Sequence, residues 1–175
     1  MAEPFVPQNR YQVSQPEWSK NAVVYQVNTR QFSSNGDLDG VREGLARIKA
    51  LGADIIYLMP VNPIGEMNRK GELGSPYSVK DYYAINPEFG NASSFEKLVK
   101  AVHAMGMKLI LDWVPNHSAW DNPLTVSHPD WYARDHKGNF RPSPWWDWDD
   151  IIEFDYNVPA LRRYMVEAMC YWVEH

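Results

Sequence analysis

Residues 108–117 (KLILDWVPNH) are the most informative segment of this chain for its fold. Its first seven residues are mostly aliphatic or aromatic, and we interpret them as a strand. Asp112, Asn116 and His117 gather at the carboxyl end of that strand. In parallel α/β folds, functional side chains collect where strands end. These three side chains are therefore the first candidates for a functional site.

Alternating strands and helices precede this stretch. Residues 23–32 (VVYQVNTRQF) begin with β-branched and aromatic side chains and predict a first strand. Residues 54–60 (DIIYLMP) are apolar in their middle and predict a second strand, buried on both faces as in a parallel sheet. Apolar residues recur at helical spacing over 41–51 and over 95–105, and residues 93–96 (SSFE) predict a capping box for the second helix.

The other segments divide the chain into regions. Residues 1–20 are polar with three prolines, and we expect an irregular arm. Residues 21–117 hold the strands and helices, with a long loop over 61–91 that contains an aromatic patch. Residues 118–155 are rich in Pro, Trp and Asp without clear periodicity, so we expect an inserted excursion. Residues 156–175 then predict a third helix.

This order predicts an α/β fold with parallel strands and right-handed crossovers. An open doubly wound sheet and part of a (β/α)8 barrel both fit it. A dinucleotide-binding sheet should carry Gly-x-Gly-x-x-Gly after its first strand, and residues 33–40 (SSNGDLDG) do not. We therefore predict a partial (β/α)8 barrel, its first three units with a short inserted domain after strand three, because a closed barrel needs eight units and ~250 residues.

Composition narrows the function classes. The chain has 175 residues, with 17 Lys+Arg against 22 Asp+Glu and a net charge of −5, which disfavours nucleic acid as a partner. No apolar run approaches the ~20 residues of a membrane span. Cys170 is the single cysteine, so an internal disulfide and a Cys-based zinc cluster are excluded, whereas the compartment stays open. The 14% aromatic content raises a carbohydrate hypothesis, since aromatic faces stack on sugars.

The polar cluster after strand three has three interpretations from its residues alone. Asp112, Asn116 and His117 could bind a polyol through directional hydrogen bonds. The Asp and Asn oxygens could hold calcium. Alternatively, Asp112 and Asn116 fix the next turn with His117 as their partner, and the residues alone slightly favour this last interpretation.

Four collinear segments resemble the α-amylase family, glycoside hydrolase family 13. They are DWVPNH (112–117), VVYQVNTRQF (23–32), LGADIIYLMPV (51–61) and SPYSVKDYYAINPEFG (75–90). The resemblance implies the N-terminal portion of a catalytic (β/α)8 barrel that acts on α-1,4-glucans or related α-glucosides, such as maltooligosaccharides, by a retaining mechanism.

The resemblance also implies roles for individual residues. His117 matches the histidine that hydrogen-bonds the 6-hydroxyl of the sugar at the cleavage point. Tyr77 matches the tyrosine whose ring stacks under that sugar. Asp112 matches the aspartate that supports an arginine beside the nucleophile, and Asn116 matches a calcium ligand of calcium-dependent members.

Two further segments contain residue types that suit calcium or sugar. Members with a calcium site in the first loop carry a longer Asp-rich run there, so we expect no calcium at Asp37 and Asp39. Residues 145–150 (WWDWDD) could stack sugars or ligate calcium. We interpret them instead as the core of a small inserted domain with a solvated acidic rim.

In the family the nucleophilic Asp ends strand four, the acid/base Glu ends strand five, and a second Asp lies on strand seven. Those positions would lie beyond His175, so we assign no catalytic residue and expect the chain alone to be inactive. Open barrel edges could promote self-association. The alternatives are a transglycosylase, and a non-catalytic carbohydrate-binding or assembly protein built on a truncated barrel.

Overall fold

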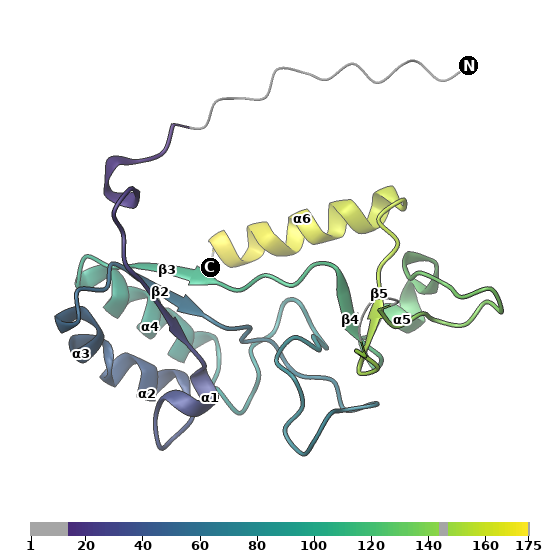
Figure 1. Cartoon of the computed structure of the whole chain (residues 1–175), viewed down its shortest axis with the longest axis horizontal. Coiled ribbons are helices and arrows are strands. Elements are labelled where there is room, and N and C mark those ends of the chain that lie inside the picture. The colour runs from purple at the N-terminus through teal and green to yellow at the C-terminus, as the bar shows by residue number, and fades with distance from the viewer. Residues whose placement is uncertain (1–13, 144–146, 175) are drawn as a thin grey trace.

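The computed structural model describes residues 14–143 and 147–174, which form two sheets with helices around them (Figure 1). The elements in chain order are η1 (Glu17–Ser19), β1 (Val24–Val27), α1 (Thr29–Phe32), α2 (Leu38–Glu43), α3 (Leu45–Ala50), β2 (Ile55–Leu58), α4 (Ala92–Ala104), β3 (Lys108–Leu111), β4 (His117–Ala119), α5 (Leu124–Ser127), η2 (Pro129–Trp131), β5 (Ile151–Glu153) and α6 (Pro159–Glu174). None of the described helices combines the length and the apolar character needed to cross a membrane.

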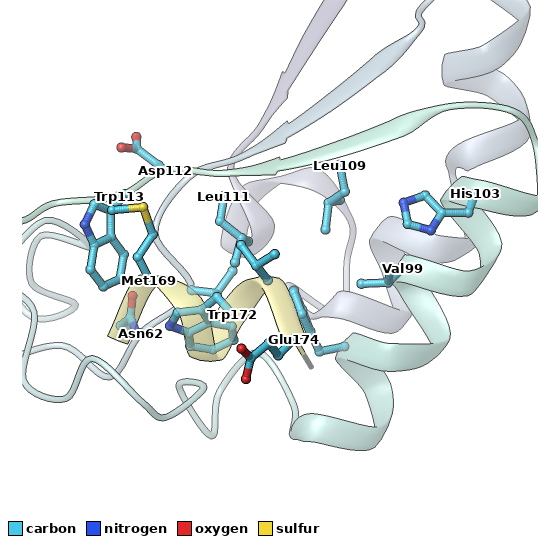
Figure 2. A pocket seen from close by; sticks show the side chains of 13 residues that line it. Asn62, Val99, His103, Leu109, Leu111, Asp112, Trp113, Met169, Trp172 and Glu174 are labelled. Carbon is cyan, nitrogen blue, oxygen red and sulfur yellow. The ribbon is translucent and has the colours of Figure 1, made fainter. Parts of the chain in front are cut away.

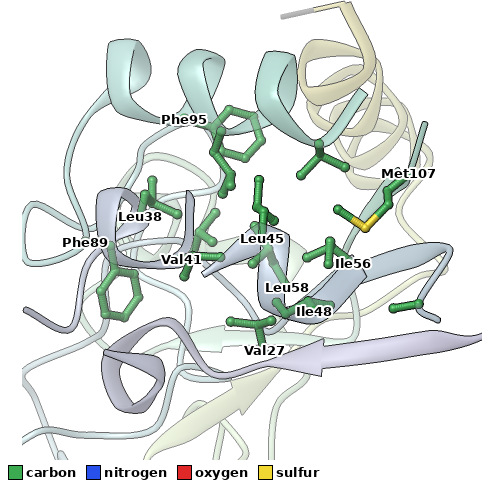
Figure 3. Close-up of a cluster of buried hydrophobic side chains, with 14 residues drawn as sticks. Val27, Leu38, Val41, Leu45, Ile48, Ile56, Leu58, Phe89, Phe95 and Met107 are labelled. Carbon is green, nitrogen blue, oxygen red and sulfur yellow. The ribbon is translucent and has the colours of Figure 1, made fainter. Parts of the chain in front are cut away.

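The first sheet has the order β1-β2-β3, and both pairs of strands are parallel. Successive side chains alternate between its two faces. One face, which includes Val27, Ile56 and Leu58, is buried in the main hydrophobic core against residues of α2, α3 and α4 (Figure 3). On the other face, Val24 and Ile110 are 52% and 41% exposed. The sheet therefore presents a covered outer face and an open face, as expected for part of a barrel wall.

Two predicted elements of the first unit differ from the structure. The predicted first strand, 23–32, ends at Val27, and its second half is the helix α1. The predicted helix over 41–51 is broken into α2 and α3 at Gly44. A Cβ atom at Gly44 would lie 2.4 Å from the ring of Phe32, so the close approach of α1 requires glycine there.

The cap of α4 lies two residues before its predicted position. Asn91 Oδ1 accepts from the Ser94 amide at 3.1 Å, and Ser94 Oγ accepts from the Asn91 amide at 2.8 Å. This reciprocal pair is a capping box in which serine takes the place of the usual Glu or Gln. The prediction for residues 93–96 was wrong because Asn91 also caps well and starts the helix earlier.

The segment after β3 forms a second, smaller sheet. Strands β4 and β5 pair antiparallel, with His117 opposite Glu153. A second hydrophobic cluster lies around them and includes Tyr82, Ile152 and Leu161. In Figure 1, α6 runs back from the β4–β5 end of the molecule towards β3. In the chain, only residues 112–116 separate the end of β3 from the start of β4.

Candidate functional site

Asp112 and Tyr77 meet at the carboxyl end of β3. The Asp112 amide donates to the Leu58 carbonyl at 2.9 Å, which continues the β2–β3 pairing by one residue. The Tyr77 hydroxyl donates to Asp112 Oδ2 at 3.0 Å. A turn delivers Tyr77, because the Ser78 amide donates to the Ser75 carbonyl at 3.0 Å. The aromatic loop is thus anchored on the strand end.

Two phenols share the Asp112 carboxylate. Burial and then the hydrogen bond to Asp112 raise the pKa of Tyr77 to about 12. Burial, followed by the same carboxylate, also raises the pKa of Tyr57 on β2. Both phenols therefore stay protonated and can act as hydrogen-bond donors. Within residues 14–143 and 147–174, Asp112 makes no ion pair with a lysine or arginine.

His117 connects the same loop to the small sheet. Its Nε2 lies 3.0 Å from the Tyr77 carbonyl oxygen, and its Nδ1 lies 2.7 Å from Asn116 Nδ2. Burial lowers the pKa of His117, so the imidazole is neutral at pH 7. A carbonyl can only accept, so Nε2 carries the proton and Nδ1 accepts from the Asn116 amide. The Tyr82 hydroxyl also donates to the His117 carbonyl at 2.6 Å, which holds the backbone in place.

A cavity of about 420 Å³ lies beside these residues, within the roughly 300–1,000 Å³ typical of small-molecule sites. It is lined by Lys70, Ser75, Tyr77, His117, Trp148, Asp150 and Ile151. Two of the four predicted site residues, Tyr77 and His117, face it directly. Asp112 and Asn116 do not line the cavity; Asp112 accepts from the Tyr77 hydroxyl, and Asn116 contacts the His117 imidazole. The structure therefore joins the four predicted residues in one network of contacts, in which Tyr77 and His117 line this cavity and Asp112 lines the second cavity described below.

Part of the interpretation of residues 145–150 was wrong. Trp148 is 43% exposed and lines the cavity, with its ring centroid 6.0 Å from that of His117. Asp150 is 5% exposed, so it is no part of a solvated rim. Trp145 and Trp146 lie outside the described residues. The mixture of Trp and Asp in residues 145–150 indicates that this segment could contribute to a binding site. It does not show which of these side chains face the cavity.

Calcium binding at Asn116 stays a prediction that rests on the resemblance. The Asn116 side chain is exposed, its amide nitrogen faces His117, and its main-chain oxygen accepts from the Phe154 amide at 3.2 Å. In the described part of the chain, no three His, Cys, Asp or Glu side chains are grouped to hold a metal. Asp37 caps α2 by accepting from the Gly40 amide at 2.7 Å, and Asp39 pairs with Arg42 at 2.9 Å.

A second cavity of about 490 Å³ lies on the helix-covered side of β3 and is mostly apolar. Figure 2 shows Leu109, Leu111 and Trp172 around it, and Asp112 also lines it, although the carboxylate of Asp112 points away. Its lining comes mainly from α4, β3 and α6. Because its lining is largely aliphatic and aromatic, we interpret it as space between packing elements and place the candidate site at the smaller cavity.

The sequence and the fold of this chain are similar to those of known proteins. The model of the family "Alpha amylase, catalytic domain" matches residues 9–175. The alpha-amylase MalA of Haloarcula japonica is 28% identical over 170 residues, covering 91% of this chain and 24% of the relative. The probable oligo-1,6-glucosidase 3 of Bacillus subtilis is 32% identical over 173 residues, covering 83% of this chain and 30% of the relative.

A solved structure agrees with the sequence relatives. An alpha-amylase from Lactobacillus plantarum matches with a TM-score of 0.85 and 44% identity, covering 88% of this chain and 36% of that chain. The chain thus spans between 24% and 36% of the length of these three proteins. Matches in family, sequence and fold all run along most of this chain. It belongs to the α-amylase family, glycoside hydrolase family 13, and forms an N-terminal portion of that family's catalytic (β/α)8 barrel.

Proposed function

We propose that this chain supplies sugar-binding residues to a retaining glycoside hydrolase that acts on α-1,4-glucans or related α-glucosides. One observation carries the proposal. Tyr77 comes from the long loop, whereas Asp112 directly follows β3 and His117 begins β4, and two 3.0 Å contacts join the three residues beside a cavity that Tyr77 and His117 line. Such convergence of an aromatic ring and directional polar groups is suited to a sugar, which has both apolar faces and hydroxyl edges.

Each residue has a proposed task. The Tyr77 ring packs against a sugar face, and its bond to Asp112 restricts the orientation of that ring. The Nε2–H of His117 is a donor of fixed tautomer, and we expect a sugar hydroxyl to share it with, or take it from, the Tyr77 carbonyl. Asn116 holds that tautomer from the opposite side of the imidazole. Asp112 orients Tyr77 through their hydrogen bond, and we expect its carboxyl group to pair with a cationic side chain beside the site.

The chemistry itself needs groups that we do not assign to this chain. A retaining glycosidase uses two carboxyl groups about 5–5.5 Å apart, one as nucleophile and one as acid/base. In the family they follow later strands than β3. We therefore expect the 175-residue chain to bind a maltooligosaccharide without cleaving it. Transfer to another sugar, rather than to water, would depend on acceptor contacts that lie largely outside these three units.

Calorimetric titration with maltotriose tests the proposal. Saturable binding by the wild-type chain, lost in Tyr77→Ala, is the expected result, with no release of reducing sugar in either case. A flat titration of a folded wild-type chain would overturn the sugar-binding assignment and favour an assembly role. Turnover by the purified chain that His117→Ala abolishes would overturn the expected inactivity.

A further inference from the structure

One wall of the cavity is formed by residues of the inserted segment 118–155, and these residues have no role in the proposed function above. Its main residues are Trp148 and Asp150, which approach the cavity from the segment before β5. Lys70, from the long loop between β2 and α4, lines the same cavity. Trp148 and Asp150 are far from Tyr77 and His117 in the sequence, so their presence at the cavity depends on contacts that hold their segment.

Those contacts come from several directions. Lys70 Nζ donates to the Asp147 carbonyl and lies 3.2 Å from Asp149 Oδ1 and 3.7 Å from Asp150 Oδ1. Ser78 Oγ donates to the Asp150 carbonyl at 2.9 Å. From β4's side, Trp120 Nε1 donates to the Asp149 carbonyl at 2.8 Å. The segment is therefore fixed by its backbone, and the wall is organised before any ligand enters.

Asp150 is the unusual member of this wall. Its side chain is 7% exposed, yet its partner Lys70 stands 3.7 Å away, beyond hydrogen-bond distance. An ionised carboxylate can accept about four hydrogen bonds, and a buried one needs such partners. Because Asp150 also lines the cavity, its acceptor capacity is available to a ligand there.

Trp148 provides a complementary apolar surface. Its ring is 43% exposed, lines the cavity, and lies edge-on to His117 at an interplanar angle of 62°. An acceptor next to an aromatic ring suits a glucose unit, whose hydroxyl hydrogens need acceptors and whose C–H face packs on aromatic rings. The charges around the cavity also favour a sugar, because a single lysine, Lys70, lies near the two carboxylates of Asp149 and Asp150. The local excess of negative charge favours a neutral sugar over a sugar phosphate.

We propose that Trp148 and Asp150 form the second wall of the sugar cavity and help to select a neutral glucoside. Asp150 accepts hydrogen bonds from hydroxyls of one glucose unit, and Trp148 packs on the apolar face of that unit or its neighbour. Lys70 is a positioning residue that holds the wall through its contacts with residues 147–150. This inference rests on the proposed function, because it concerns the same cavity.

The test uses the full chain labelled with 5-fluorotryptophan and maltotriose as the probe. Trp148→Phe identifies the fluorine resonance of Trp148, which should shift on titration. We expect Asp150→Asn to weaken maltotriose binding by about tenfold or more, the effect of losing a hydrogen bond to a charged group. Trp148→Ala removes the aromatic surface that packs on the sugar, and we expect it to weaken maltotriose binding about tenfold. Lys70→Gln should weaken it several-fold, and Lys70→Arg should restore it. Asp130→Asn, an exposed carboxylate in η2, is the matched control and should bind as the wild type does.

The outcomes separate the two proposals. If the wild type binds and Tyr77→Ala does not, but Asp150→Asn and Trp148→Ala bind as the wild type does, the second wall is wrong and the proposed function stands. If the folded wild-type chain shows no saturable binding, both are overturned. Circular dichroism checks the fold of each variant. Should Asp150→Asn unfold, Trp148→Ala decides the result, because its ring is half-exposed and its loss leaves the core intact. Tighter binding of maltose 1-phosphate than of maltose would contradict the selection for a neutral sugar.

Discussion

The hydroxyl of Tyr77 donates to the carboxylate of Asp112 over 3.0 Å, although the two residues are 35 positions apart in the chain. One residue lies in a long loop and the other at the end of β3. Their bond, together with the contact between His117 and the Tyr77 carbonyl, ties the loop to the strand end and to the small sheet. A surface loop thereby becomes the fixed wall of a cavity.

Removing only the hydroxyl of Tyr77 should separate its two tasks. Tyr77→Phe keeps the ring and loses the bond to Asp112, so we expect a loss of about 1 kcal/mol in the free energy of unfolding. Maltotriose binding should weaken less than in Tyr77→Ala, which loses the ring as well. Urea unfolding and calorimetric titration measure the two effects. Equal binding losses in both variants would show that the ring face contributes nothing.

His117 should make stability depend on pH. Burial lowers the pKa of His117 below its usual 6.5, so the unfolded chain takes up a proton at this residue before the folded chain does. Stability from this group is therefore fully present above pH 6.5 and is lost as pH falls through the folded pKa. Urea midpoints between pH 7.5 and 5 should fall less in His117→Gln than in the wild type. His136→Gln, an exposed histidine, is the control and should keep the wild-type slope.

The contact between Phe32 and Gly44 should be intolerant of a methyl group. A Cβ at Gly44 would meet the Phe32 ring at 2.4 Å, so we expect Gly44→Ala to cost about 1–3 kcal/mol of stability. In a double-mutant cycle with Phe32→Leu, the cost of Gly44→Ala should shrink, because the smaller side chain relieves the overlap. Additive costs in urea unfolding would mean that the ring is not the cause.

The open sheet should favour association of the isolated chain. In the described residues, β1 and β3 are the two edges of the parallel sheet, and Ile110 on its open face is 41% exposed. Unpaired strand edges beside apolar side chains promote pairing with other chains, and lysine opposes it. We expect sedimentation velocity to show concentration-dependent association that Ile110→Lys reduces. Val126→Lys on α5, far more exposed but away from the sheet, should leave it unchanged, and a wild-type chain that is monomeric at all concentrations would contradict the expectation.

Much of the fold was predictable because its information is local. Periods of 2 and 3.6 residues reveal strands and helices within about ten positions, and β2, α4 and β3 were all expected near where they lie. Errors occurred where a distant contact alters a local preference. The ring of Phe32 lies against Gly44 at the break between α2 and α3, which the apolar periodicity of residues 41–51 does not reveal.

By itself, the sequence determined the alternation of strands and helices, the family, and the residue types Tyr77, Asp112 and His117 that could bind a sugar. The tertiary structure was needed to show that Tyr77 and His117 line one cavity, that Asp112 is hydrogen-bonded to Tyr77, and that Asp150 is buried in the wall of the same cavity. Lys70 and Asp150 illustrate the reason, because they are 80 positions apart and no periodic pattern links them. Their proximity follows from contacts between distant loop segments, such as the hydrogen bonds from Lys70 to the Asp147 carbonyl and from Ser78 to the Asp150 carbonyl.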